Sequence, residues 1–442
     1  MDATARPGCL NAVDPRATIS ESPMRALQWA VVAICSILNG IEGFDVLAIT
    51  YVAPSIAEGW HLDKAVVGIL ISSGLAGMGI GSILLASFAD RAGRRAALLL
   101  SLAIPAIGMA LSAVSPDILT LGLSRFFSGI GIGLLLAVIS TVVAEFANDR
   151  RRALALSLMM VGYPIGAGIG GAGAAFLLQH HDWPAVFWLG AIVTAAMIPA
   201  VFLFVPDSID FHVSRGRGDA LDQVNRLLAR LGHAAIDSLP PPPEKVARVP
   251  LTTILGPRLI RTTLTVTASF VLFISTFYFY IGWLPSMVVD MGFTKTGGAS
   301  AAVGVTSGGA IGGIVFGLLS RRIGLKRLLI LSMILTWLTI SLFGHVPHEL
   351  AIVQVSAFIV GFVMMGAIIG YYSLMAAAFP TDARATGMGF VVGIGRIGAV
   401  LAPITAGALM SANFSNASVG AIMALGALAS AAVTATLRVG VD

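Results

Sequence analysis

Charged side chains are scarce in this chain, at 11% of its 442 residues. A soluble globular domain carries about 25%, so the composition excludes a soluble fold. Cysteine is scarcer still. Cys9 and Cys35 are the only two, which excludes a disulfide framework and a cysteine-based metal site. The first 24 residues lack an apolar core, and we therefore expect no cleavable signal peptide there.

Long apolar runs take the place of the missing charge, since 57% of the residues are hydrophobic. About 20 consecutive apolar residues can cross a bilayer as a helix, and these runs lack the strict alternation of outer-membrane strands. The sequence therefore predicts an all-α integral membrane protein with twelve transmembrane helices. The predicted segments are 28–51, 66–88, 96–114, 118–144, 153–178, 185–205, 262–284, 300–319, 326–344, 351–374, 387–411 and 417–437.

The basic residues predict how these segments are oriented. If the N-terminus lies in the cytoplasm, nearly all of the 27 lysines and arginines fall in the tail or in loops on the cytoplasmic side. Lys64 and Lys295 alone fall on the opposite side, while Arg125 and Arg396 lie within segments. This distribution follows the positive-inside rule, so we expect both termini in the cytoplasm. The net charge of +5 then serves topology and the anionic inner leaflet, not a nucleic-acid partner.

Short motifs recur between the two halves of the chain at a nearly constant spacing. Ala53-Pro54-Ser55 returns as Leu284-Pro285-Ser286, and the loop 86–95 returns at 317–326. Like-oriented repeats of six spans, with a site between them, indicate a transporter that alternates access. We predict a cytoplasmic N-terminal tail (1–24), a six-helix bundle (25–206), a cytoplasmic linker (207–257) and a second, pseudo-symmetric six-helix bundle (258–442).

The linker differs from its flanks in composition. It contains a short amphipathic pattern at Ala220–Leu231, which predicts a helix, and a proline run at Pro240–Pro243. We interpret the proline run as a stiff polyproline II spacer in preference to a docking site.

Few carboxylates lie where they could carry a proton across the membrane. All seven histidines fall in loops or at segment ends. Glu42 and Asp45 are three residues apart in the first segment and project from roughly the same helix face. Charges at bilayer depth need a polar cavity, so we predict a proton or substrate site facing water between the bundles. Asp45 is favoured because its shorter side chain reaches less far, and the alternative is a pair near the membrane surface.

Glu145 and Asp290 are further candidates near segment ends. Glu145 closes the fourth segment, which Arg125 opens about 30 Å away. The two could belong to one polar relay without touching. The alternatives are an interfacial anchor for Arg125 and an ion pair with Arg150–Arg152 for Glu145.

Arg396 lies deep in the eleventh segment, too far in to be a loop charge. A guanidinium matches a carboxylate with two hydrogen bonds, so we predict that Arg396 binds an anionic substrate. A structural pair with a carboxylate of another helix is the alternative. Arg384, at the cytoplasmic edge of the same segment, is expected to be a gate contact.

The aromatic residues near segment ends and the glycine-rich stretch each have two possible roles. Trp283, like Trp60 and Trp183, lies where an interfacial anchor is expected. Trp283 and the run 277–280, which includes Tyr280, could instead stack on an aromatic ligand, or the run could face lipid. The glycines around Gly162-Tyr-Pro-Ile-Gly166 indicate close helix packing, with a hinge at the proline as the second possibility.

The loop Asp90-Arg91-Ala-Gly93-Arg94-Arg95 and its second copy resemble the signature of the major facilitator superfamily. Within that superfamily the chain resembles the aromatic acid:proton symporters of bacteria. The residues that carry this resemblance are Glu42-Gly43-Phe44-Asp45, Arg125 with its glycine row, Glu145-Phe-Ala, Gly162-Tyr-Pro-Ile-Gly166, Trp283-Leu-Pro285, and Arg384 with Gly395-Arg396-Ile-Gly398.

The resemblance implies that the acidic pair of the first segment is needed for transport and that Arg125 and Arg396 belong to charge networks. It also implies that Asp90 and Arg94 form a cytoplasmic gate. The second copy of the loop has Arg321 where the first has its acidic residue, so a symmetric second gate is not expected.

The first functional hypothesis is a proton-coupled importer of a small aromatic carboxylate in the bacterial inner membrane. It would need no cofactor beyond the proton and would work as a monomer. The second hypothesis is an exporter of drugs or metabolites by proton exchange on the same fold, and a non-transporting receptor is the third. An enzyme is not expected, because we find no nucleophile–base pair, metal cluster or phosphate loop.

Overall fold

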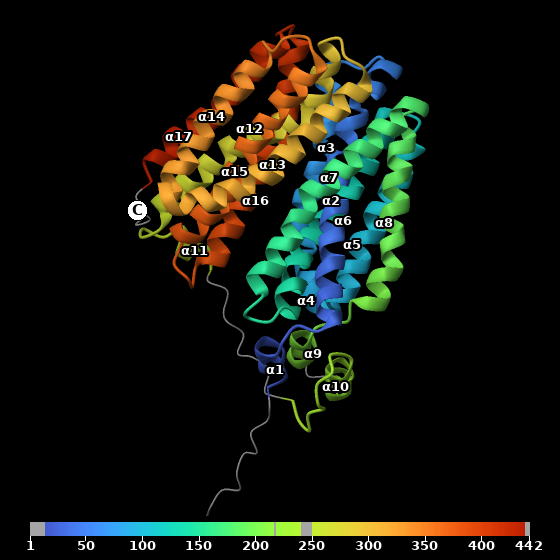
Figure 1. Cartoon of the computed structure of the whole chain (residues 1–442), viewed down its shortest axis with the longest axis vertical. Coiled ribbons are helices and arrows are strands. Elements are labelled where there is room, and N and C mark those ends of the chain that lie inside the picture. The colour runs from blue at the N-terminus through green and yellow to red at the C-terminus, as the bar shows by residue number, and fades with distance from the viewer. Residues whose placement is uncertain (1–13, 216–217, 240–249, 438–442) are drawn as a thin grey trace, which may run out of the picture.

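The computed structural model of the chain describes residues 14–215, 218–239 and 250–437 (Figure 1). In these residues every regular element is a helix, and twelve helices are long and apolar enough to cross a membrane. They are α2 (Ala26–Gly59), α3 (Lys64–Leu84), α5 (Arg94–Ala113), α6 (Ile118–Phe146), α7 (Arg152–His180), α8 (Pro184–Phe204), α12 (Ile260–Asp290), α13 (Lys295–Ile323), α14 (Leu325–Phe343), α15 (Leu350–Ala378), α16 (Arg384–Ser411) and α17 (Asn416–Ala435). The predicted twelve-helix membrane fold is confirmed.

The remaining helices are short: α1 (Pro15–Glu21), α4 (Ala86–Ala92), α9 (Ile209–Arg215), α10 (Ala220–Arg230) and α11 (Leu251–Ile254). The predicted amphipathic helix of the linker is therefore present as α10. The proline run lies outside the described residues. Helix α1 was not expected in the tail.

Local chemistry sets several helix ends. The side chains of Asp63, Asp117 and Thr294 accept hydrogen bonds from the first turns of α3, α6 and α13. Gly93 and Gly324 separate α4 from α5 and α13 from α14 with φ angles of 105° and 89°. These two positive angles favour glycine, and they turn the chain at equivalent places in the two halves.

Figure 1 shows the long helices in two bundles, one containing α2 to α8 and the other α12 to α17. The bundles converge at one end and diverge toward the end that carries α1, α9 and α10. We call the latter the linker end and the former the far end. Contacts between the bundles are made by α3 with α16, α7 with α13 and α2 with α12.

Within the first bundle, α2 and α7 pack so closely that glycine is required on both. A Cβ atom at Gly166 would lie 2.2 Å from the Cα of Gly40, and one at Gly162 would lie 2.1 Å from the carbonyl oxygen of Ser36. The glycine row therefore allows close helix packing, which is the first of the two interpretations that the sequence offered.

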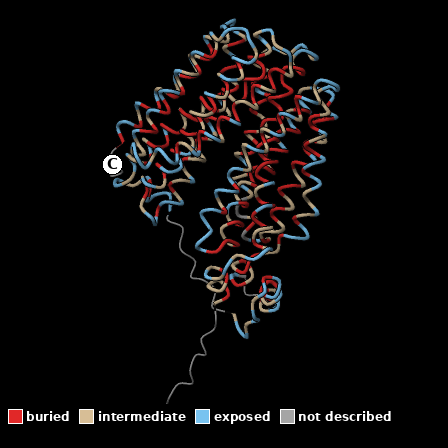
Figure 2. Tube along the Cα trace, in the orientation of Figure 1, coloured by how far each residue is buried: buried red, intermediate tan, exposed pale blue. Residues whose placement is uncertain are grey.

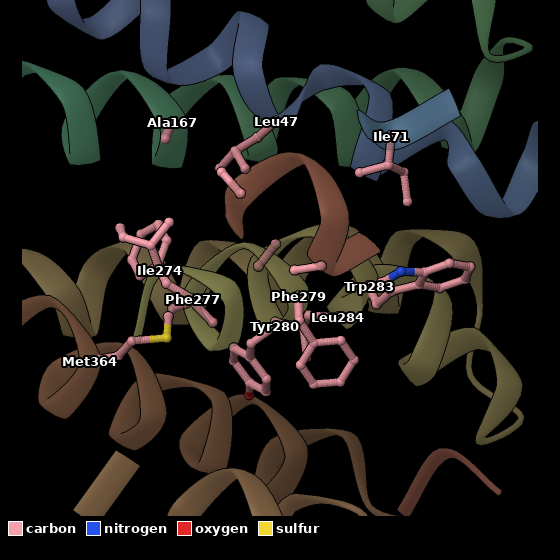
Figure 3. Close-up of a cluster of buried hydrophobic side chains, with 14 of the residues drawn as sticks. Leu47, Ile71, Ala167, Ile274, Phe277, Phe279, Tyr280, Trp283, Leu284 and Met364 are labelled. Carbon is pink, nitrogen blue, oxygen red and sulfur yellow. The ribbon is translucent and has the colours of Figure 1, made fainter. Parts of the chain in front are cut away.

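The outer surfaces are apolar, as a lipid-facing surface requires. Ile83, Leu119 and Ile169 are 70%, 68% and 69% exposed, a pattern that a soluble monomer avoids on this scale. Buried residues run through the middle of both bundles (Figure 2). Figure 3 shows part of that core, where side chains of α12 meet those of neighbouring helices.

The linker end of the first bundle is covered by short helices. Arg16 of α1 pairs with Asp210 of α9, and the Asn148 amide donates to the carbonyl oxygen of Ser22 over 2.8 Å. Val224, Leu227 and Leu228 form the buried face of α10. The tail and the described part of the linker are thus tied to the first bundle.

Candidate functional site

Asp45 of α2 and Arg125 of α6 form an ion pair in the interior of the first bundle. Arg125 Nη2 donates to Asp45 Oδ1 over 2.6 Å and to the Asp45 carbonyl oxygen over 2.8 Å. Ser128 Oγ donates to Asp45 Oδ2 over 2.9 Å, and the guanidinium lies 5.5 Å from the centre of the Phe187 ring. Both charged side chains are at most 2% exposed. The expectation that Asp45 faces water between the bundles is wrong for this conformation, because its carboxylate lies inside one bundle with both oxygens bonded.

Glu42 lies one helical turn earlier on α2, and its carboxylate lacks the ion pair that Asp45 forms. It is 2% exposed, yet its Oε2 atom has no hydrogen-bond partner in the described part of the chain. Arg396, from the other bundle, is the opposite charge that acts on it. A buried carboxylate oxygen without a donor is costly, so Glu42 is the acid in this region whose bonding is incomplete.

Arg396 of α16 is half-buried where α16 meets α3. Its Nη1 atom donates to the Tyr278 hydroxyl of α12 over 3.2 Å and lies 3.4 Å from the Met78 sulfur of α3. Gly79 of α3 packs beside it, and a Cβ there would be in ordinary van der Waals contact, 3.6 Å from the Arg396 Cβ. The guanidinium therefore lies at the junction of the two bundles, and its predicted binding of an anionic substrate stays a prediction.

Trp283 and Tyr280, the predicted aromatic contacts, are fully buried within the structure (Figure 3). Trp283 Nε1 donates to the Pro403 carbonyl oxygen over 3.0 Å, and the Tyr280 ring stands edge-on to Phe343 at 5.5 Å. Trp283 is not an interfacial anchor, because its side chain has no exposed surface. In this conformation neither residue can stack on a solute.

Sequence reasoning gave no binding role to Tyr163 and Tyr372, and it singled out Tyr280 in the run that contains Tyr278. Tyr163 of α7, Tyr278 and Tyr372 of α15 are all within electrostatic range of Glu42 and Arg396. A signal was present in Gly162-Tyr163-Pro164, where a polar ring stands in a row of small residues. The aromatic run 277–280 drew attention to Tyr280, although Tyr278 is the member that reaches Arg396.

At the linker end, Arg94 and Glu145 form an ion pair of 2.8 Å with side chains 14% and 13% exposed. Glu145 therefore pairs neither with Arg125 nor with Arg150–Arg152, and Arg152 instead pairs with Asp149 at 2.9 Å. Gly93 packs against Asp207, whose Oδ1 would lie 2.6 Å from an added Cβ.

Two other residues were predicted to belong to the gate, Asp90 and Arg384. The side chain of Asp90 lies outside what the structure describes, so its place in the predicted gate stays a prediction. Arg384 is exposed at the first residue of α16.

The far end is closed by contacts between the bundles. Lys64 of α3 pairs with Asp290 of α12, and Lys295 of α13 pairs with Glu58 of α2, each at 2.7 Å. Deeper in, Ser72 Oγ donates to the Val400 carbonyl oxygen over 2.7 Å. Asp290, a candidate proton carrier near a segment end, is thus the last residue of α12 and forms an ion pair.

Two further bonds at the far end involve Ser411 of α16. Its hydroxyl donates to Asp63 and accepts from the Ala65 backbone N–H, the latter over 2.8 Å. Asp63 accepts hydrogen bonds from the Ser411 hydroxyl and from the Ala65 backbone N–H. Both bonds lower the pKa of the Asp63 carboxyl below its ordinary value, because both stabilise the charged form.

The arrangement suits translocation. Two helical bundles are joined at the far end and separate toward the linker end, with a carboxylate and a guanidinium at their junction. Among the described residues no group of three or more His, Cys, Asp or Glu side chains could hold a metal ion. The class of protein that this fold and junction define is a membrane transporter with alternating access.

Comparison with known proteins identifies the family. The family model of the Major Facilitator Superfamily matches residues 35–314 and 298–440, and the chain belongs to this superfamily. It is therefore a transporter and not an enzyme, as predicted.

Curated relatives and solved structures agree with this assignment. A gallate transporter of Pseudomonas putida is 29% identical over 402 residues, which cover 90% of this chain and 89% of the relative. The 4-hydroxybenzoate transporter PcaK of Acinetobacter baylyi is 25% identical over 412 residues, covering 92% and 90%. The structure of the xylose transporter XylE from E. coli, in a partially occluded inward-open conformation, matches with a TM-score of 0.73 at 16% identity, covering 94% of this chain and 99% of XylE.

Proposed function

We propose that this protein imports a small aromatic carboxylate together with protons across the bacterial inner membrane. It does so as a monomer, with the proton as its coupling ion and no other cofactor. The names of its relatives support this substrate class, since they include gallate and 4-hydroxybenzoate transporters. The linker end and both termini face the cytoplasm, as the distribution of basic residues favours. In the conformation described above, the bundles then lie farther apart on the cytoplasmic side than on the opposite side (Figure 1).

The observation that carries the proposal is that Glu42 and Arg396, which come from different bundles, lie within electrostatic range of each other without forming an ion pair. When Glu42 is ionised, it offsets the charge of Arg396. When Glu42 takes up a proton, Arg396 is left without a counter-charge and can bind a substrate carboxylate with two hydrogen bonds. Protonation of Glu42 therefore favours binding of the substrate carboxylate to Arg396. The bound carboxylate in turn favours the protonated form of Glu42, so that proton and substrate bind together.

Asp45 has a structural part in this scheme. Its carboxylate already accepts hydrogen bonds from Arg125 and Ser128, so it fixes α6 against α2 and leaves Glu42 as the proton carrier. This reverses the preference for Asp45 that the sequence suggested. Symport of one proton with a monovalent anion is electroneutral, and a second proton would add about 2.3 kcal/mol per 100 mV of membrane potential.

The proposal is tested with purified protein in liposomes and labelled 4-hydroxybenzoate. Uptake should rise with an inward proton gradient, and Glu42→Gln should lose this dependence while retaining exchange of internal for external substrate. Glu349→Gln, at an exposed residue before α15, is the matched control and should behave as the unaltered protein. Uptake that ignores the proton gradient would refute symport. Efflux driven by an inward proton gradient would instead support the exporter.

A further inference from the structure

The chain has six tyrosines, and the structure divides them into two groups. Tyr51, Tyr280 and Tyr371 are fully buried in the core. Tyr51 donates to the Ala167 carbonyl oxygen over 3.0 Å, and Tyr371 bonds to Ser269 over 2.7 Å. These core tyrosines act in packing.

The second group consists of Tyr278, which hydrogen-bonds to Arg396, and of Tyr163 and Tyr372, which lie within electrostatic range of Arg396. The three come from α7, α12 and α15, and therefore from both bundles. Tyr163 and Tyr372 each interact electrostatically with Tyr278, Glu42 and Arg396, and Tyr278 accepts a hydrogen bond from Arg396. Five helices thus bring one carboxylate, one guanidinium and three phenols within electrostatic range of one another.

The hydroxyls of Tyr163 and Tyr372 have no hydrogen-bond partner among the residues that the structure describes. Tyr372 is 39% exposed, while Tyr163 is half-buried. A phenol hydroxyl both donates and accepts. Two accessible phenols beside a carboxylate-binding guanidinium therefore offer hydrogen bonds to the rest of a bound molecule.

We propose that Tyr163 and Tyr372 bind ring hydroxyl groups of the substrate, so that the site selects hydroxylated aromatic carboxylates over unsubstituted ones. The inference rests on the proposed function, in which Arg396 holds the carboxylate and the ring lies beside it. A site that hydrogen-bonds a substrate hydroxyl discriminates against the analogue without it. At the strength of one ordinary hydrogen bond, each contact changes affinity by about 3- to 10-fold.

The test compares benzoate, 4-hydroxybenzoate and 3,4,5-trihydroxybenzoate in the same liposome assay. The unaltered protein should show a KM for benzoate at least about 3-fold above that for the hydroxylated acids. Tyr163→Phe or Tyr372→Phe should raise the KM of a hydroxylated acid by about 3- to 10-fold and leave that of benzoate unchanged.

Tyr280→Phe is the matched control, because Tyr280 lies on α12 and its hydroxyl has no partner among the described residues. It should change none of the three KM values. Equal KM values for benzoate and the hydroxylated acids, or equal effects of the phenylalanine variants on all three, would overturn the inference. Both results leave the proposed function standing. If none of the three acids is taken up by the unaltered protein, the proposed function fails and this inference with it.

Discussion

Lys64, the first residue of α3, and Asp290, the last residue of α12, form an ion pair of 2.7 Å that joins the two bundles at the far end. Lys295, the first residue of α13, pairs with Glu58 near the end of α2 at the same distance. Each pair takes its lysine from one bundle and its carboxylate from the other. The two pairs are thus related by the same approximate symmetry as the halves of the sequence, and opening of the far end must break both.

Removing both lysines should therefore favour opening of the far end. The side chains of the first pair are 34% and 31% exposed, and an exposed pair contributes about 0.2–1 kcal/mol. We expect Lys64→Ala with Lys295→Ala to raise the population open at the far end by about 2- to 30-fold. Spin labels at the exposed residues Asp182 and His348, one on each bundle, should report a larger share of long distances.

Arg152→Ala is the control for this experiment, because Arg152 pairs with Asp149 within one bundle. Its distance distribution should match that of the unaltered protein. An unchanged distribution in the double variant would mean that the ion pairs do not hold the far end closed.

A second prediction concerns the buried pair of Asp45 and Arg125. Asp45→Asn leaves the Arg125 guanidinium buried without a counter-charge, and breaking such a pair costs about 3–5 kcal/mol. We expect a clearly lower midpoint of thermal unfolding in detergent and loss of uptake. Ser128→Ala removes a single hydrogen bond to the same carboxylate and should cost about 1 kcal/mol. Equal stability of Asp45→Asn and the unaltered protein would contradict a structural role for Asp45.

The third prediction separates the charge of Arg396 from its shape. Arg396→Lys keeps the positive charge but cannot offer two parallel donors to a carboxylate. Loss of one hydrogen bond to a charged group costs about 1.5–3 kcal/mol, so the KM for 4-hydroxybenzoate should rise by about 10- to 100-fold. Arg322→Lys, at the exposed end of α13, serves as the control. An unchanged KM in Arg396→Lys would mean that Arg396 does not bind the carboxylate.

The twelve helices could be predicted from the sequence because length and apolarity alone define a membrane span. The bundles and the linker followed from repeated motifs and from the change in composition after residue 206. Helix α2 nevertheless extends to Gly59, beyond the predicted end at residue 51, and Pro54 lies inside it. The existence of the membrane spans was thus easier to predict from the sequence than the residues at which they end.

The faces of the helices could not be predicted. A helix that is apolar on all sides carries no pattern to show which residues point toward its neighbours. Asp45 was therefore assigned to the junction, although it pairs with Arg125 inside one bundle, and Trp283 was assigned to the membrane surface, although it is buried. Spacing along α2 indicated that Glu42 and Asp45 share a face, but not that Asp45 would pair with Arg125 while Glu42 is left within electrostatic range of Arg396.

A fourth prediction addresses the contact of α2 with α7. Gly166→Ala would place its Cβ 2.2 Å from the Cα of Gly40, so the helices must move apart, and such overpacking costs about 1–3 kcal/mol. Gly393→Ala is the matched control, because nothing lies within 4 Å of a Cβ at that position. Thermal unfolding of both variants should show a loss only for Gly166→Ala. Similar midpoints for the two would show that α2 and α7 adjust without strain.

The last prediction concerns His212 of α9, which lines a cavity of about 280 Å³ with Asp207 and Asp219. Partial burial lowers the pKa of His212 below its ordinary value, although the two carboxylates oppose this shift. Because the folded state binds the proton less tightly than the unfolded state, stability is highest above about pH 6.5 and falls as the pH drops toward the folded-state pKa. Amide hydrogen exchange in α10, corrected for intrinsic rates, should therefore be faster at low pH, and His212→Gln should abolish that part of the change. If His212→Gln retains the full effect of pH, other groups hold the linker helices in place.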